Sequence, residues 1–187
     1  MKNTKNHLVV RFNLKKILPE DIRLGSKVAD ALDELIKKKT LMSDPSFLVT
    51  VPTHDDPDLA PPNRSSYYIL FPTPNLDADI DWRTEGSRYR DKMLQAMEER
   101  GYEGFAESIE VEQMTTPVDW RRLGMERGAP FASAHTFFQT GPFRPRNIAK
   151  GFENVVFTGS GTQPGVGVPM VLISGRLAAE RILGATK

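Results

Sequence analysis

The stretch GSGTQPGVGVP, residues 159–169, decides how the last part of this chain folds. It holds four glycines and two prolines, and it separates an apolar strand-like run at residues 155–157 from a helix-like run at residues 170–183. This density of glycine and proline predicts a tight turn whose backbone a ligand can approach closely. A helix that begins just after the turn directs unpaired N–H groups and the positive end of its dipole back toward it. Such a turn is suited to the anionic or polar parts of a cofactor.

The two common phosphate-binding glycine motifs do not fit the spacing of this stretch. A dinucleotide-binding G-x-G-x-x-G motif beginning at Gly159 requires a third glycine at position 164, where the chain has Pro164. A Walker motif requires Lys and then Ser or Thr after its last glycine, whereas Val166 and Gly167 follow Gly165. Spacing alone leaves two interpretations open: a ligand-binding turn, and a glycine-rich connection between strand and helix.

Three ordered blocks of sequence decide between these interpretations. The first is NVVFTGSGTQPGVGVPMVLISGRLAAERI, residues 154–182, which joins an apolar run, a GTxPGxG turn and a helix rich in small residues. The second is HTFFQTGPFRPRN, residues 135–147, and the third is DPDLAPPNRSSYYILFPTPNL, residues 56–76, followed by DIDW. Together they resemble the phytoene desaturase family of carotenoid-forming flavoenzymes. The resemblance covers roughly residues 40–185 and, more weakly, the first forty.

The resemblance implies an FAD-dependent oxidoreductase that desaturates a long apolar polyene precursor such as phytoene. In such an enzyme the protein binds the flavin, excludes water and aligns the apolar chain against the flavin ring. No position matches a catalytic acid or base, so no catalytic residue is assigned. The positions that match flavin-contacting segments are Gly159, Ser160, Gly161 and Thr162, toward the ribityl and phosphate groups, and Gly165, Val166, Gly167, Val168 and Met170, toward the isoalloxazine ring.

One part of the family's pattern is not found in this sequence. Members of the family begin with a βαβ unit that carries G-x-G-x-x-G and holds the adenosine and pyrophosphate of FAD. We therefore expect a C-terminal part of such an enzyme, inactive alone, that works with an N-terminal FAD-binding partner chain. The alternative is a non-enzymatic remnant that serves as an apolar-ligand-binding or interaction module.

The composition is that of an ordinary globular protein, with 39% hydrophobic and 26% charged residues in a chain of 187. A net charge of +1 gives no electrostatic footprint for nucleic acid, and no apolar run is long enough to cross a membrane. The lack of cysteine excludes disulfides and thiolate chemistry and fits a reducing compartment, so we expect a cytoplasmic protein. Carotenoid precursors reside in membranes, which keeps peripheral membrane contact open.

The order of apolar runs predicts an α+β fold. The resemblance assigns residues 1–125 to a substrate-associated antiparallel sheet with helices, and residues 126–187 to the C-terminal strand–helix unit of a Rossmann-like FAD-binding domain. The predicted strands are residues 7–12, 47–51, 67–71, 107–114 and 155–157. The predicted helices are residues 26–38, 81–100 and 170–183, with a short helix opening at Thr116 and Pro117.

No metal site is predicted. The histidines, His7, His54 and His135, lie far apart, and the acidic cluster at residues 55–58 lacks the spaced ligands of a calcium loop. His135 and Thr136 could form an acid–base pair, but a histidine beside aromatic residues more often has a structural role.

Two further groups of side chains admit a structural and a functional interpretation. Four phenylalanines surround His135, and core packing is the favoured explanation, with an apolar wall for a hydrocarbon substrate as the alternative. Arg144 and Arg146 flank Pro145, and the sequence leaves open whether they face solvent or anchor a loop. The phenylalanines are Phe131, Phe137, Phe138 and Phe143. Core positions at helical spacing are predicted at Trp82, Tyr89, Met93 and Met97.

Overall fold

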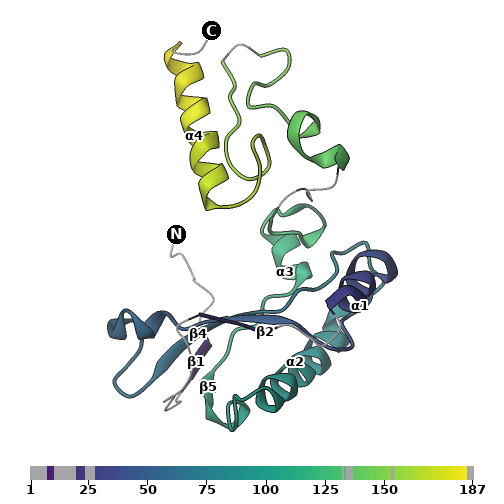
Figure 1. Ribbon diagram of the computed structural model, residues 1–187, viewed down its shortest axis with the longest axis vertical. Helices are drawn as coiled ribbons and strands as arrows, with labels where there is room; N and C mark the ends of the chain where they lie inside the picture. Colours follow the sequence, from purple (N-terminus) through teal and green to yellow (C-terminus); the bar gives the residue numbers. More distant parts are fainter. Residues whose placement is uncertain are drawn as a thin grey trace. The chain divides into compact units, whose positions relative to one another are not determined.

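A computed structural model describes residues 8–10, 20–23, 28–131, 133, 137–152 and 154–184 of the chain. The chain divides into two compact units, Met1–Arg122 and Leu123–Lys187, called unit 1 and unit 2 below. Unit 1 runs from purple to teal in Figure 1, and unit 2 from green to yellow. In the part of the chain that the structure describes, no helix is both long and apolar enough to cross a bilayer.

Unit 1 is built on a five-stranded sheet in the order β2-β3-β4-β1-β5, with antiparallel neighbours throughout (Figure 1). Its register places Val49 opposite Ile69 and Leu8 opposite Tyr67. This mixture of helices with an antiparallel sheet confirms the predicted α+β class. The strands are β1 (Leu8–Val10), β2 (Glu20–Arg23), β3 (Phe47–Thr50), β4 (Ser65–Leu70) and β5 (Ile109–Val111).

Aromatic and aliphatic side chains from β3, β4, the long helix α2 (Trp82–Glu99) and the segment after it form the core of unit 1. Alternate side chains of β3 point inward, as the period of a half-buried strand requires. The rings of Tyr67, Tyr102 and Phe105 are fully buried and pack edge to face. The ring centroids are 5.1 Å apart for Tyr67 and Phe105, and 6.0 Å apart for Tyr102 and Phe105. Such pairs add about 0.5–1.5 kcal/mol each beyond the burial of their area.

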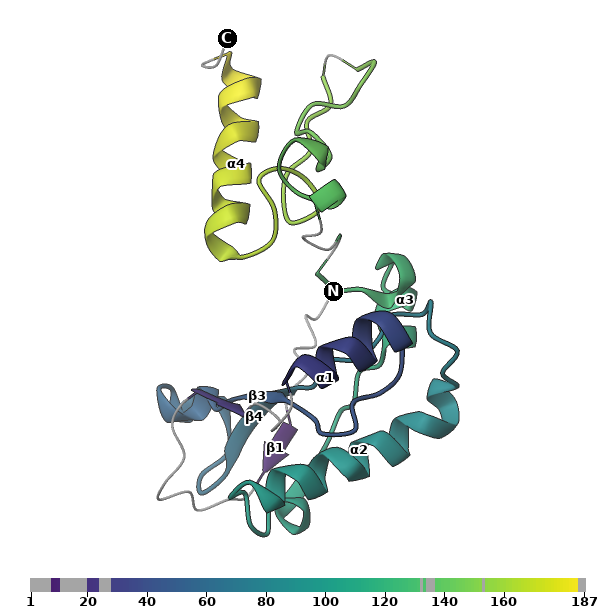
Figure 2. The same cartoon turned by 45° about the vertical axis from the view of Figure 1, so that its right-hand side comes forward.

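Two helices lie beside this sheet in Figure 2, α1 (Val28–Asp33) and α2. α1 continues into a wider helical turn, Glu34–Lys38, which ends where Lys39 adopts a φ of 55°. α2 begins after Asp81, whose carboxylate accepts a 3.1 Å hydrogen bond from the amide of Arg83 and so caps the helix. The buried face of α2 confirms all four core positions predicted by helical spacing, Trp82, Tyr89, Met93 and Met97.

The short helix α3 (Pro117–Arg122) begins as predicted, with a capped proline start. The Thr116 hydroxyl and the Thr116 amide both donate to Oδ2 of Asp119, over 2.6 and 2.9 Å. These two hydrogen bonds hold the pKa of the Asp119 carboxyl below its ordinary value. The local sequence alone therefore fixes where this helix starts.

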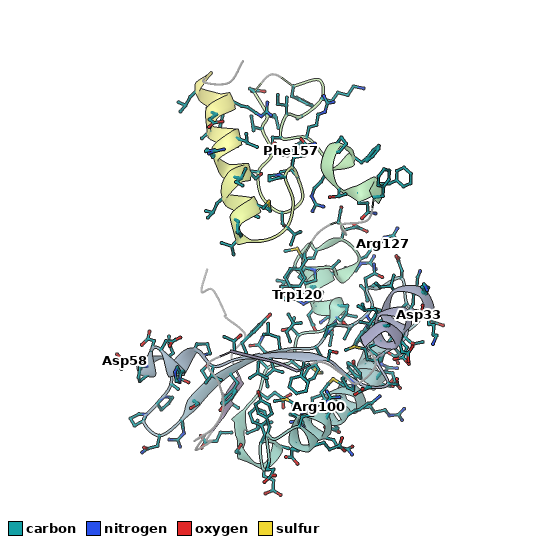
Figure 3. The ribbon with its side chains drawn as sticks, in the orientation of Figure 1. Asp33, Asp58, Arg100, Trp120, Arg127 and Phe157 are labelled. Carbon is teal, nitrogen blue, oxygen red and sulfur yellow. The ribbon has the colours of Figure 1, made fainter. Side chains whose placement is uncertain are left out.

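Unit 2 consists of one helix, α4 (Val168–Leu183), beside an irregular segment that precedes it (Figure 1). Short 3₁₀ turns at Glu126–Gly128, Phe137–Gln139 and Gly141–Phe143 interrupt this segment. The predicted strand at residues 155–157 is wrong: only Val156 forms a β-bridge, to Ile148. The bridge is held by two hydrogen bonds, from the Phe157 amide to the Asn147 carbonyl and from the Ala149 amide to the Val155 carbonyl, and the described residues of unit 2 do not extend this pairing into a ladder. Phe157 lies in this irregular segment in Figure 3.

Candidate functional site

The glycine-rich turn adopts a backbone that only glycine allows at its two ends. Gly159 has a φ of 106° and Gly167 a φ of 111°, both in the left-handed region that side chains avoid. Gly167 directly precedes α4 and offers no side chain to cap it. The first amides of α4, those of Val168 and Met170, therefore receive no side-chain cap and lack helical partners.

Gly161 lies in the middle of the turn and differs from these two glycines. It is exposed, its φ lies outside the left-handed region, and an added Cβ would meet no atom within 4 Å. Neither the backbone nor the packing of the described residues therefore requires glycine at this position. Close approach of a bound molecule does explain a missing side chain here.

Arg144 fastens the turn from behind. Its guanidinium, 1% exposed, donates to the carbonyls of Ser160 and Thr162 in the turn and to those of Ser133 and Gln139 upstream. The Nε–Thr162 bond is 3.2 Å long and the Nη1–Gln139 bond 3.1 Å. Of the two interpretations that the sequence left open for Arg144, the structure selects the anchoring of a loop. Arg146, two residues on, is exposed.

A second buried side chain, Asn147, ties the turn to α4. Its Nδ2 donates to the carbonyls of Phe157 and Gln163, each over 3.1 Å, and to the hydroxyl oxygen of Ser174 over 3.2 Å. The same hydroxyl oxygen accepts a 3.1 Å hydrogen bond from the amide of Gly159. The hydroxyl of Ser174 thus connects α4 to the glycine-rich turn through hydrogen bonds.

Pro145 completes the fastening, because its carbonyl accepts two hydrogen bonds from the turn. The hydroxyl of Thr162 donates to it over 2.7 Å and the amide of Gln163 over 2.9 Å. The side chain of Thr162 is therefore turned inward and buried. Residues 144–147 and the glycine-rich turn belong to two separate blocks of sequence, and the structure brings them into direct contact.

The nine predicted flavin-contacting positions lie along one continuous path from the turn to the start of α4. Gly161, Gly167, Val168 and Met170 are exposed, whereas Gly165 is buried with Thr162. Their contact with a flavin stays a prediction. Sequence reasoning missed Asn147 and Ser174, whose roles depend on contacts across 27 residues that no local pattern reveals.

The favoured interpretation of the four phenylalanines is wrong, because none of them packs into a core. The exposed fractions are 60% for Phe131, 72% for Phe137, 75% for Phe138 and 54% for Phe143. The last three rings contact one another instead, with centroids 5.2 to 5.6 Å apart. Short 3₁₀ turns hold Phe137, Phe138 and Phe143, and such turns have no buried face on which to hide a ring. The predicted pair His135 and Thr136 lies outside the described residues.

Within the described residues, no group of acidic or histidine side chains is arranged to hold a metal ion. The glycine-rich turn has backbone amides and open space next to the N-terminus of α4. The buried guanidinium of Arg144 binds the inner side of this turn. These features are typical of a site for a phosphate-bearing organic cofactor, as in the flavin-dependent oxidoreductases.

Comparison with known proteins defines the family. Residues 50–183, well over half of the chain, match the flavin containing amine oxidoreductases, and the chain belongs to this family. It is 51% identical over 166 residues to a phytoene dehydrogenase of Streptomyces griseus, covering 87% of this chain and 33% of that protein. It is 35% identical over 189 residues to a zeta-carotene-forming phytoene desaturase of Myxococcus xanthus, covering 98% of this chain and 36% of that protein.

A lycopene-forming phytoene desaturase of a Paracoccus species is 34% identical over 179 residues, which cover 95% of this chain and 36% of that protein. These matches confirm the predicted resemblance to phytoene desaturases and FAD as the cofactor of the family. The chain spans about a third of the length of the curated relatives it matches.

Proposed function

We propose that this chain forms part of an FAD-dependent phytoene desaturase of carotenoid biosynthesis, and that its glycine-rich turn and the start of α4 contact the flavin. The observation that carries the proposal is Gly161, an exposed glycine that neither φ nor packing requires. Its open side is the face of the turn from which a ligand can reach the backbone. When bound, the flavin supplies the two-electron acceptor that dehydrogenation of a C–C bond requires.

The chain's own residues would bind and orient the cofactor. Gly159, Ser160 and Gly161 would face the ribityl and phosphate groups, and the buried Thr162, whose carbonyl binds Arg144, would support them from inside the turn. The uncapped amides of Val168 and Met170, at the positive end of the α4 dipole, would face the ring and favour negative charge on it. The other positions expected near the ring are Gly165, Val166 and Gly167.

The exposed phenylalanines support a long apolar polyene as the substrate. Phe137, Phe138 and Phe143 contact one another yet are more than half exposed, so they present a continuous apolar surface. We assign this surface to the wall along which the substrate lies. Because such a substrate is dissolved in the membrane, we propose that the protein is cytoplasmic and reaches the substrate through peripheral contact with the membrane.

A partner segment would complete the flavin site. The named relatives are about three times as long as this chain, and α4 exposes Leu172, Ile182 and Leu183 at 68%, 73% and 80%. We propose that a dinucleotide-binding segment covers these side chains and holds the adenosine end of FAD. In this arrangement residues 1–125 are the substrate-associated region and residues 126–187 belong to the FAD-binding domain.

The test is an FAD titration of the full chain, alone and mixed with the two thirds of the Streptomyces griseus relative that the chain does not match. Flavin fluorescence and absorption report binding, and the appearance of longer conjugated polyenes from phytoene reports activity. We expect weak or no binding alone, and stoichiometric binding with desaturation in the mixture. Tight binding alone would exclude the need for a partner. No binding in either case would exclude the flavin role, and polyene binding without flavin would favour the non-enzymatic module.

Gly161→Val tests the carrying observation directly. The added Cβ meets no atom within 4 Å, so thermal unfolding without FAD should change little, while FAD affinity in the mixture should fall by about tenfold or more. Lys150→Val, at an exposed position of the same unit, is the matched control and should bind FAD as the parent chain does.

A further inference from the structure

Arg144 carries a buried positive charge that protein carbonyls bind but do not neutralise. Four hydrogen bonds join its guanidinium to carbonyl oxygens. No carboxylate lies within ion-pair distance of Arg144 among the residues that the structure describes. Burial of a cation costs desolvation free energy unless hydrogen bonds compensate for the lost water. Carbonyl groups supply such bonds, but they are neutral and leave the net positive charge in place. The interior behind the glycine-rich turn therefore keeps a positive potential.

The hydrogen bond to Ser160 also fixes the direction of the next amide. The only cis peptide in the described residues is Gln163–Pro164, so the peptide between Ser160 and Gly161 is trans. In a trans peptide the C=O and N–H bonds point in opposite directions. Because the Ser160 carbonyl points inward to Arg144, the Gly161 N–H points away from the unit's interior.

Gly161 joins this donor to the open space. The residue is exposed, and no atom lies within 4 Å of the position that a Cβ would occupy. The Gly161 N–H points outward into open space, and the positive charge of Arg144 lies on its inner side. This arrangement favours an anionic oxygen over a neutral hydroxyl as the ligand.

We propose that Arg144 is a positioning residue of the flavin site. It holds the Ser160–Gly161 peptide so that the Gly161 N–H binds an anionic pyrophosphate oxygen of FAD. This inference rests on the proposed function and adds to it the residue that shapes the turn and the part of the cofactor that the turn receives. Lysine cannot replace Arg144, because one ammonium with three donors cannot reproduce a planar fork that reaches four carbonyls.

The experiment compares Arg144→Lys with Arg146→Lys, which changes an exposed arginine two residues away, in the mixture that binds FAD. FAD and riboflavin are the probes, because only FAD carries the pyrophosphate. We expect Arg144→Lys to weaken FAD binding by about tenfold and riboflavin binding by less than about twofold, and Arg146→Lys to change neither. Equal losses for both probes would show that Arg144 only supports the fold and would overturn the proposal. Unchanged FAD affinity would overturn it as well.

A second measurement needs no cofactor. The Gln163 amide donates to the Pro145 carbonyl over 2.9 Å, so its hydrogen exchange reports the fastening of the turn. In the free full chain we expect Arg144→Lys to speed this exchange by about tenfold and Arg146→Lys to leave it unchanged. If the parent mixture binds no FAD, the proposed function fails. If it binds FAD and the lysine variant exchanges and binds as the parent does, only the role of Arg144 fails.

Discussion

The two units of this chain fill their interiors with opposite kinds of side chain. Unit 1 buries Phe47, Val49, Tyr67, Met97, Tyr102 and Phe105, a cluster of aromatic and aliphatic groups. Among the described residues of unit 2, the buried large side chains are Arg144 and Asn147, and only alanines represent the apolar residues, Ala149 and Ala178. Unit 2 keeps its own phenylalanines outside.

This difference shows what each unit is built to do. An apolar core gives unit 1 most of its stability, because burial of apolar area is the dominant favourable term in folding. Unit 2 holds one irregular turn in one shape with directional hydrogen bonds, and leaves apolar side chains for other molecules to cover. Directional hydrogen bonds specify geometry more sharply than they stabilise, and the network is not complete, because the buried Oδ1 of Asn147 has no partner among the described residues.

The largest effect is expected from Phe105→Ala in unit 1. The ring is fully buried between Tyr67 and Tyr102, so its loss leaves a cavity and should cost about 3–5 kcal/mol of the free energy of unfolding. Urea unfolding followed by tryptophan fluorescence measures it, since both tryptophans, Trp82 and Trp120, belong to unit 1. A loss below about 1 kcal/mol would contradict an aromatic core.

Arg144→Met should produce the next largest effect, confined to unit 2. The substitution keeps an apolar stem but removes the donors of four carbonyls, and we expect the local free energy of opening to fall by about 3 kcal/mol. Hydrogen exchange of peptides spanning residues 139–165 measures this change. The control is Arg146→Met, for which exchange should stay within about 0.5 kcal/mol of the parent. Equal effects of the two variants would contradict the conclusion that the buried hydrogen bonds of Arg144 hold unit 2 together.

Ser174→Ala should loosen the junction of turn and helix by about 1–2 kcal/mol. The change removes the oxygen that binds both the Gly159 amide and Asn147, while the helix propensity of residue 174 improves. Faster exchange of the Gly159 amide is the expected signal. Ala179→Ser, on an exposed position of α4, adds a hydroxyl without touching the turn and serves as the control.

Unit 1 should lose stability at alkaline pH through Tyr67. Its hydroxyl is buried and has no hydrogen-bond partner among the residues that the structure describes, and burial raises its pKa above the ordinary value of about 10. The native state thus keeps a proton that the unfolded chain releases, so stability is full below about pH 10 and falls as pH rises above it, by about 1 kcal/mol per pH unit. Circular dichroism during urea unfolding at pH 9 and 11 tests this. Tyr67→Phe should reduce the pH dependence, and an unchanged slope would contradict the assignment.

The smallest effect is expected from Phe138→Ala in unit 2. The ring is 75% exposed, so its removal should change stability by less than about 0.5 kcal/mol, far below the effect of the same change at Phe105. Hydrogen exchange across unit 2 provides the measurement. A loss as large as that of Phe105→Ala would mean that the ring is covered and that the two units are alike.

The sequence predicted unit 1 better than unit 2, and the reason is physical. Alternation in residues 47–51, helical spacing in residues 81–100 and the Thr116 cap are local patterns, and in unit 1 a core or a nearby side chain supports the element that each of them predicts. β2 escaped prediction because its residues, EDIR, are mostly polar, and pairing with β3 rather than propensity makes them a strand.

In unit 2 the deciding interactions join distant residues. The run at residues 155–157 has the composition of a strand, but among the described residues it forms a single bridge, between Val156 and Ile148. The glycine-rich turn was located correctly, whereas its fastening by Arg144 and Asn147 depends on contacts up to 27 residues apart that spacing rules do not contain. Aromatic side chains generally prefer an apolar core, but the described residues of unit 2 form no such core, so its phenylalanines stay exposed.

The polar interior of unit 2 also has a calorimetric consequence. Exposure of apolar surface raises the heat capacity of unfolding, whereas exposure of polar surface lowers it. Unit 2 already exposes most of its large apolar groups and buries Arg144, Asn147, Thr162 and Ser174, so its heat-capacity step should be small. Its stability curve should accordingly be flat with temperature, while unit 1 follows the curved profile of an apolar core. The shape of the turn would then vary little between cold and warm conditions.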